Sequence, residues 1–183
     1  MAAADQAPKA DPLPEIPGEG PAGLRLAEPG QRLLARIVDT LVVGLPVIMV
    51  LREVVPAGDV EIAAPPAVAG LLLLYEWVQL VLWGRTLGKR VAGIHVVPSP
   101  PHAVSQGPES DGEAIASAPL GVGRSLLRSA VYALPIAARP VPVFGLIAGL
   151  LWVGNAALMY EGTWRQALHD RLSGTVVVRR GAA

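Results

Sequence analysis

The segment "QRLLARIVDTLVVGLPVIMVL", residues 31–51, decides the fold. From Leu33 to Leu51 it runs for 19 residues, nearly all of them apolar, which is long enough to span a bilayer core of roughly 30 Å. Its first turns nevertheless carry Arg32, Arg36 and Asp39. Charged groups inside a bilayer are costly, so they usually face the protein interior and pair with one another. The segment therefore predicts a membrane helix with one polar face.

The composition of the whole chain supports a small integral membrane protein. Of its 183 residues, 52% are hydrophobic and 16% are charged, against about 25% charged in an ordinary soluble domain. The net charge is zero, so there is no electrostatic case for binding nucleic acid. The abundance of Ala, Pro, Gly and Arg, with only two lysines, indicates a bacterial genome of high G+C content. We therefore expect a plasma (inner) membrane protein of a bacterium.

Catalytic and cofactor chemistry finds no support in the sequence. The chain has no cysteine, which excludes a thiol nucleophile, a disulfide and cysteine-ligated metals. Its three histidines share no metal-ligand spacing, and no serine lies in a nucleophile-elbow pattern. The sequence predicts a protein that is not an enzyme and that holds no metal or cofactor.

The apolar runs predict an all-α helical membrane protein with four membrane segments in two hairpins. Residues 1–31 are rich in Ala, Pro, Gly and acidic residues and predict a disordered tail before a membrane domain at residues 32–180. A second polar stretch, residues 98–119, predicts a disordered cytoplasmic loop. The predicted membrane segments are about 33–51, 67–83, 126–138 and 141–160.

The sequence allows either four or three membrane crossings, because "ARPVP" (138–142) interrupts the last apolar stretch. With four crossings and both termini cytoplasmic, only Arg52 and Arg139 of the 15 basic residues fall on the outer side. This distribution agrees with the excess of Lys and Arg in cytoplasmic loops. With an interfacial helix and three crossings, four C-terminal arginines would lie outside. Charge placement favours four crossings with a cytoplasmic N-terminus.

An internal repeat links two distant parts of the chain. The stretches "LGKRVAGIHVV" (87–97) and "LHDRLSGTVVV" (168–178) align without gaps, with Gly93 opposite Gly174. Each predicts a short helix, a glycine in the left-handed conformation after it, and a strand. Upstream, "GQRLLAR" (30–36) resembles "GRSLLR" (123–128). Two similar units would place both strands on the cytoplasmic side, where they could pair as a small two-stranded β element.

Three of these stretches together resemble the RDD family of prokaryotic integral membrane proteins: "RLLARIVD", "GRTLGKRVAGIHVV" and "LHDRLSGTVVV". The family is named for one arginine and two aspartates. On this chain the resemblance places them at Arg32, Asp39 and Asp170. It implies a membrane protein whose molecular role is largely undefined, although transport, including cation/proton exchange, has been suggested for some members.

Spacing along the predicted helices indicates a polar layer. Arg36 lies four residues after Arg32 and three before Asp39, a spacing at which helical side chains meet. Asp39 would lie roughly 9 Å and Glu76 roughly 10 Å inside the bilayer boundary. The predicted layer consists of Arg36, Asp39, Glu76, Gln79 and Asn155.

Two interpretations of this layer remain open. In the first, it is a proton or cation site in which Asp39 and Glu76 are the carriers and Arg36 tunes them. In the second, it is a structural clamp in which Arg36 pairs with Asp39 and Glu76 meets another arginine. For Asp170 we expect a latch at the start of the first membrane helix, with Arg32, Lys89 or Arg90 as its partner.

The sequence thus leaves two functional classes. One is a transporter of a small solute or cation; the other is a non-catalytic accessory or scaffold protein that stabilises a partner complex. The lipid bilayer is the expected surrounding in both cases. Gly145 and Gly149 form a G-x-x-x-G pattern, which serves helix packing within the chain or a homo-oligomer interface.

Overall fold

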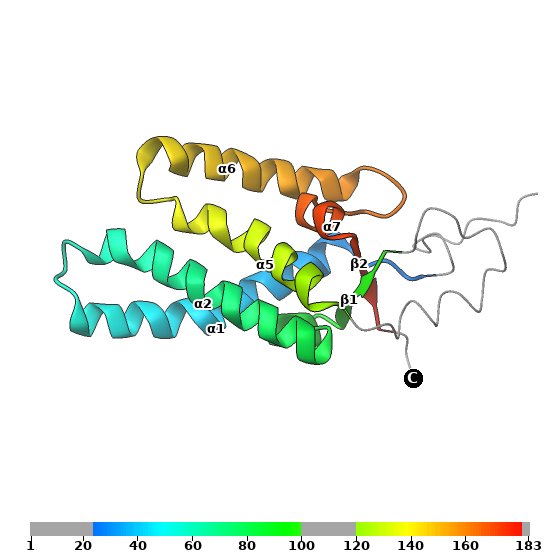
Figure 1. The fold of residues 1–183 in the computed structure, drawn as a ribbon, viewed down its shortest axis with the longest axis horizontal. Coiled ribbons are helices and arrows are strands. Elements are labelled where there is room, and N and C mark those ends of the chain that lie inside the picture. The colour runs from blue at the N-terminus through cyan, green and yellow to red at the C-terminus, as the bar shows by residue number, and fades with distance from the viewer. Residues whose placement is uncertain (1–23, 100–119, 181–183) are drawn as a thin grey trace, which may run out of the picture.

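The computed structural model describes residues 24–99 and 120–180. In the first half, a helical hairpin is followed by a short helix and a strand (Figure 1). Pro46 lies inside the first hairpin helix, and Pro65 and Pro66 lie inside the second, which membrane helices tolerate. The elements of this half are α1 (Pro29–Val54), α2 (Val60–Trp83), α3 (Leu87–Val91) and β1 (Ile94–Pro98).

The second half repeats this order with shorter hairpin helices. Its second hairpin helix continues into a 3₁₀ turn. Every residue of this helix is described by the structure, and Ala148 is the only buried one. Its elements are α5 (Val122–Ala137), α6 (Pro142–Ala157), the turn η2 (Leu158–Tyr160), α7 (Leu168–Ser173) and β2 (Thr175–Arg179).

The two hairpins run in the same direction along the bundle. In Figure 1, the α1–α2 and α5–α6 connections lie together at one end, while the sheet and α7 lie at the other. We call the latter the sheet end. Helix α5 lies between the first hairpin and α6 and packs against α2. As a result, side chains from both halves meet in the interior of the sheet end.

The predicted pairing of the two strands is confirmed. β1 and β2 are antiparallel, and Val96 lies opposite Val177. These two valines are also counterparts in the sequence repeat, so an approximate twofold axis passes close to them. Gly93 and Gly174 both have positive φ, 68° and 60°, as the repeat predicts for the residue between helix and strand.

The segment just before α1 corrects the predicted tail. Leu26 forms a bridge with Val178, and the Ala27 N–H donates to the Val177 carbonyl at 3.0 Å. Leu24 and Leu26 pack with the apolar side chains of the sheet. The predicted tail ends at residue 31, but α1 begins at Pro29, so the predicted boundary falls inside α1. The residues just before α1 are also part of the fold, because Leu24 and Leu26 supply apolar surface that the sheet buries. Residues 1–23 and 100–119, which hold most of the predicted tail and loop, lie outside the described residues.

The surface of the helices is that of a membrane protein. Among the described residues, three helices are long and apolar enough to cross a bilayer: α1, α2 and the stretch Pro142–Tyr160. Their outer faces are rich in exposed Leu, Val and Ile. Helix α5, with 16 residues, reaches about 24 Å and is shorter than a typical span. The described part is thus mostly helical with a small two-stranded sheet, as the sequence predicts.

Candidate functional site

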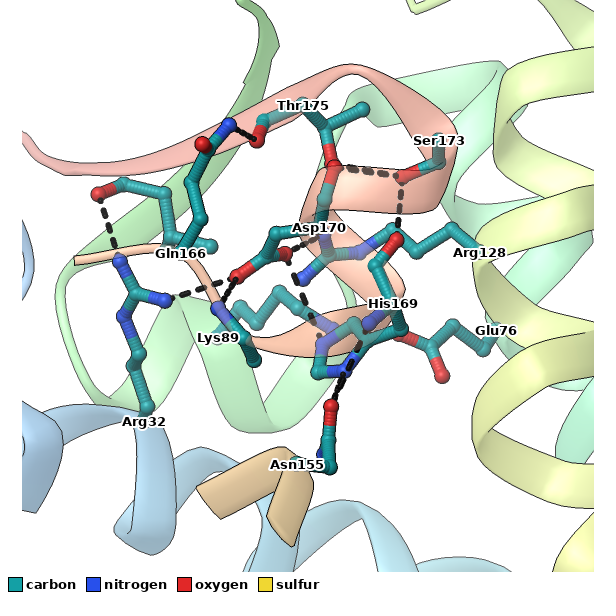
Figure 2. A network of polar contacts seen from close by, with 12 residues as sticks. Arg32, Glu76, Lys89, Arg128, Asn155, Gln166, His169, Asp170, Ser173 and Thr175 are labelled. Atoms are coloured by element: carbon teal, nitrogen blue, oxygen red, sulfur yellow. Dashed lines mark hydrogen bonds and ion pairs between the residues drawn. The ribbon is translucent and has the colours of Figure 1, made fainter. Parts of the chain in front are cut away.

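Three carboxylates lie buried at or near the sheet end: Asp39 from α1, Glu76 from α2 and Asp170 from α7. Each has at most 1% of its surface exposed. An ionised carboxylate so deep is destabilising unless charges and hydrogen bonds compensate it. The partners of each carboxylate therefore show what the network does; Figure 2 shows the part of it around Asp170, with Arg32 and Arg128.

Asp170 joins both halves of the chain. Arg32 from α1 donates to its Oδ2 at 2.8 Å, and Arg128 from α5 pairs with its Oδ1. The Ala167 N–H at the start of α7 donates to Oδ2 at 3.1 Å, which is how an acid in the first turn satisfies a free helix end. Burial by itself raises the pKa of Asp170, but Arg128 and Arg32 outweigh it and hold the pKa well below its usual range. The predicted contact between Arg32 and Asp170 is present, and Arg128 is a second partner that sequence reasoning missed.

Glu76 is held by two cations. Arg36 from α1 lies 2.6 Å from Oε2, and Lys89 from α3 lies 2.9 Å from Oε1. The predicted pairing of Arg36 with Asp39 is therefore wrong. The Arg36 guanidinium reaches across to α2 and lies 3.6 Å from the centre of the Tyr132 ring, so cation–π contact adds to the ion pair. Lys89, which the repeat suggested as a partner of Asp170, pairs with Glu76 instead.

Asp39 is surrounded by uncharged donors. The Tyr75 hydroxyl and the Gly88 N–H each donate to Oδ1 at 2.8 Å, and the Thr86 hydroxyl donates to Oδ2 at 2.5 Å. Helix α3 can approach this closely because residue 88 has no side chain. A Cβ at Gly88 would lie 2.1 Å from the Ala35 carbonyl oxygen and 2.8 Å from the Asp39 carboxylate. Asp39 thus fastens α3 to α1.

His169 connects the remaining predicted residue to the network. Its Nδ1 lies 2.8 Å from Asn155 Oδ1, and its Nε2 lies 3.4 Å from an Arg36 N–H. Nε2 also lies 3.5 Å from Asp170 Oδ1. Because the Arg36 guanidinium can only donate, a neutral ring that accepts at Nε2 carries its proton on Nδ1, facing Asn155 Oδ1. Burial lowers the pKa of His169 to about 3, in agreement with a neutral ring. Asn155 therefore reaches Arg36 only through His169.

The other residues singled out from the sequence lie near this network or away from it. Gln79 is half-buried on α2 and is a hydrogen-bond neighbour of Tyr75. Gly145 lies against the Arg139 backbone, whereas a Cβ at Gly149 would meet open space. Within residues 24–99 and 120–180, no three Asp, Glu, His or Cys side chains group closely enough to hold a metal ion.

The network has more positive than negative charge. With His169 neutral, its four cations exceed the three carboxylates by one elementary charge. The cations are Arg32, Arg36, Lys89 and Arg128; the carboxylates are Asp39, Glu76 and Asp170. The arrangement can hold or exchange a proton among these groups, and its excess charge opposes the entry of a metal cation.

A comparison with known protein families matches part of this chain. Residues 26–104 match the RDD family. The predicted resemblance is thereby confirmed for the segment that holds Arg32 and Asp39. The matched RDD segment also includes Glu76 and Lys89, whereas Asp170 lies beyond it and joins it through Arg32. Comparisons with curated proteins and with solved structures return no match.

Two signals in the sequence pointed to the residues that were missed. Arg128 lies in "GRSLLR", the weaker arm of the repeat, at a position close to that of Arg36. Thr86 precedes Lys89 by three residues, which is typical of a helix N-cap, and its hydroxyl accepts from the Lys89 N–H at 3.3 Å. Nothing in the sequence signals that the Tyr75 hydroxyl would reach Asp39.

Proposed function

We propose that this RDD-type membrane protein transports a small solute and couples its movement to a proton exchanged at the Glu76–Lys89 pair. One observation carries the proposal: a buried lysine pairs with Glu76 and is connected to Asp39 through the Thr86 hydroxyl. Lys89 Nζ lies 2.9 Å from Glu76 and 3.4 Å from the Thr86 hydroxyl, which in turn donates to Asp39. The chain of contacts links the two groups that the sequence suggested as carriers.

Lys89 is suited to lose and regain a proton. Burial lowers the pKa of Lys89 to about 8, despite the opposing attraction of Glu76. When Lys89 is neutral, Arg36 still pairs with Glu76, so the carboxylate is not left alone. The pair can thus change its protonation near neutral pH without leaving an isolated buried charge.

The charge balance favours a proton over a metal cation as the coupled ion. A cation that entered this network would add to an excess of positive charge in a region of low dielectric. A proton leaving Lys89 removes that excess. The charge balance therefore favours coupling to a proton over exchange of a metal cation, and the transport assay identifies the solute.

Four crossings with both termini in the cytoplasm of a bacterial cell form part of this proposal. It is supported by the position of both hairpin connections at the end of the bundle opposite the sheet. It is also supported by the position of Arg52 and Arg139, which lie close to those connections while the buried cations lie near the sheet. Reporter fusions after Ala57 and Arg139 should report the outer side, and a fusion after Ala183 the inner side.

Proteoliposomes test the transport proposal. The purified protein should move protons, read by an internal pH dye, when a transported solute is added, with a panel of cations, anions and neutral solutes screened. Glu76→Gln and Lys89→Met should abolish the signal, while Glu61→Gln, a matched change at an exposed position of α2, should keep it. If no solute in the panel produces proton movement with the wild type, the proposal fails.

An accessory role is the second candidate, and the complete pairing of the three carboxylates favours it. Asp39, Glu76 and Asp170 each have at least two donors, as a rigid scaffold requires. In this case the same variants would reduce the folded amount without affecting any flux. Crosslinking in native membranes followed by purification should then recover one defined partner in stoichiometric amount.

A further inference from the structure

A cavity at the sheet end carries an inference that does not depend on transport. It has a volume of about 80 Å³, room for several water molecules or for one small oxyanion. It lies among α1, α5, α6 and α7. Leu33 and Trp152, which are 56% and 40% exposed, form its rim, so its mouth opens on the outer surface between α1 and α6.

The charged side chains that line the cavity are all basic. Arg32, Arg36, Lys89 and Arg128 line it together with His169, and none of the described residues that line it is acidic. The three carboxylates of the network do not line the cavity, and together they leave one of these four positive charges uncompensated. The cavity therefore presents a positive potential in a setting where charges are weakly screened.

Two buried donors support the same conclusion. Arg32 and Arg128 are 7% and 1% exposed, and the Nε–H of each has no hydrogen-bond partner among the described residues. Buried N–H groups without partners are unusual and costly. Arg32 and Arg128 thus belong to a cluster whose charges and donors are not fully compensated within the described residues, and a negative group in the adjacent cavity would balance its charge.

The rim and walls indicate the source of that acceptor. The inner surface is largely carbon, from the stems of the basic side chains and from Leu33, Trp152 and Met159. Arg32 is close to the start of α1, and Tyr160 ends the turn η2 that continues α6, which places the cavity near the level of lipid headgroups. A negative group attached to an apolar chain matches both the charge and the rim.

We propose that this cavity binds the phosphate group of an anionic phospholipid, which enters sideways between α1 and α6. The excess positive charge holds the phosphate, and Leu33 and Trp152 contact the start of the acyl chains. Inorganic phosphate presents the same group without the chains, so the experiment separates the two sources.

The test uses a matched pair of variants at Ala156, a half-buried residue of the cavity wall. Ala156→Asp places a carboxylate that cancels the excess charge, whereas Ala156→Asn has the same shape without the charge. Native mass spectrometry from detergent should show bound phosphatidylglycerol on the wild type and on Ala156→Asn. Binding to Ala156→Asp should fall about fivefold or more, as expected for one elementary charge near an anionic lipid.

A second pair, Met159→Glu and Met159→Gln, keeps the test valid if Ala156→Asp does not fold. Equal retention of phosphatidylglycerol by the acidic and neutral variants of both pairs would overturn the proposal. Equal binding of phosphatidylcholine and phosphatidylglycerol by the wild type would also overturn it, because the cavity would then select chains and not charge. Binding of inorganic phosphate without phosphatidylglycerol would overturn the lipid as the source.

Discussion

The two halves of the chain form the same structural unit, but the ion pairs of the short helix differ between them. In both, a hairpin leads to a short helix, a glycine with positive φ and a strand. In the first half, Lys89 of the short helix pairs with Glu76 of its own hairpin. In the second half, the equivalent residue is Asp170, and one of its two partners, Arg32, comes from the other half. A change of sign at one position thus turns an internal contact into a contact between halves.

The residue before this position differs in a related way. Gly88 lets α3 approach α1 within contact of the Ala35 backbone, whereas its counterpart His169 fills that space and binds Asn155. The first half is therefore closed by close backbone packing and the second by side chains. Each of the following predictions tests one side of this comparison, from the largest effect to the smallest.

Removing the charge of Asp170 should have the largest effect. Asp170→Asn leaves Arg32 and Arg128 buried without their carboxylate, which typically costs about 3–5 kcal/mol of unfolding free energy. Reversible unfolding in detergent or bicelles measures the loss. Glu161→Gln, an exposed acid between α6 and α7, is the control and should change little.

The same site allows a stricter test of the contact between halves. A double-mutant cycle of Arg32→Gln with Asp170→Asn should give a clear coupling energy, as should the cycle of Arg128→Gln with Asp170→Asn. Strictly additive losses in the first cycle would contradict the role of Arg32 in joining the halves.

Adding one methyl group at Gly88 should have the second-largest effect on stability. Gly88→Ala places a Cβ against the Ala35 carbonyl and the Asp39 carboxylate, and we expect a loss of about 3 kcal/mol from overpacking. Gly70→Ala in α2, where a Cβ meets nothing within 4 Å, is the matched control and should be neutral or stabilising. Similar unfolding midpoints for the two variants would show that α3 does not pack on α1 as described.

Neutralising Asp39 should lower the free energy of unfolding by less than Asp170→Asn or Gly88→Ala does. Asp39→Asn keeps the shape but turns one acceptor into a donor, which then faces a hydroxyl or an N–H. One mismatched buried group typically costs about 1–3 kcal/mol, and we expect a loss within that range. Exchange of the Gly88 amide hydrogen should also become faster, because that N–H donates to Asp39. Unchanged protection of Gly88 would argue against the contact.

The smallest effect concerns pH. Folding lowers the pKa of His169 to about 3 from its ordinary value of 6.5, so below pH 6.5 the unfolded chain binds a proton that the folded chain does not. The contribution of neutral His169 to the free energy of unfolding is therefore fully present above about pH 6.5 and is lost as the pH falls toward 3. The lowered pKa of Asp170 adds a loss in the same direction at still lower pH. Arg36, Arg128, Glu76 and Asp170 all face the ring and contribute to the shift.

Unfolding free energies measured between pH 7 and 5 test this prediction. The wild type should lose stability over this range, and His169→Gln should show a flatter dependence. A variant with the same slope as the wild type would show that His169 is not the group responsible.

Much of the fold could be predicted because its patterns are local. The apolar runs placed the first two membrane helices, and the repeat placed both glycines and both strands. The Arg32–Asp170 contact was also predictable, since both residues belong at the same end and carry opposite charge.

The pairings inside the bundle could not be predicted, because they depend on how neighbouring helices are rotated. Spacing along α1 put Arg36 beside Asp39, but α2 offers Arg36 a carboxylate at 2.6 Å, and the approach of α3 at Gly88 supplies Asp39 with other donors. The start of α1 was misplaced for a similar reason: Leu24 and Leu26 become ordered only against a sheet formed by distant strands.

The contact between Arg32 and Asp170 has a consequence for how the protein is made. A ribosome delivers α1 to the membrane long before α7 has been synthesised, so Arg32 must wait near the bilayer surface without its carboxylate. Arg128 waits as well, although for a shorter time. Only when residues 168–179 arrive can both arginines be neutralised and β2 add to β1. A segment that is synthesised late therefore completes the interior of one that is synthesised early, and a chain interrupted before residue 168 would leave both arginines without their carboxylate.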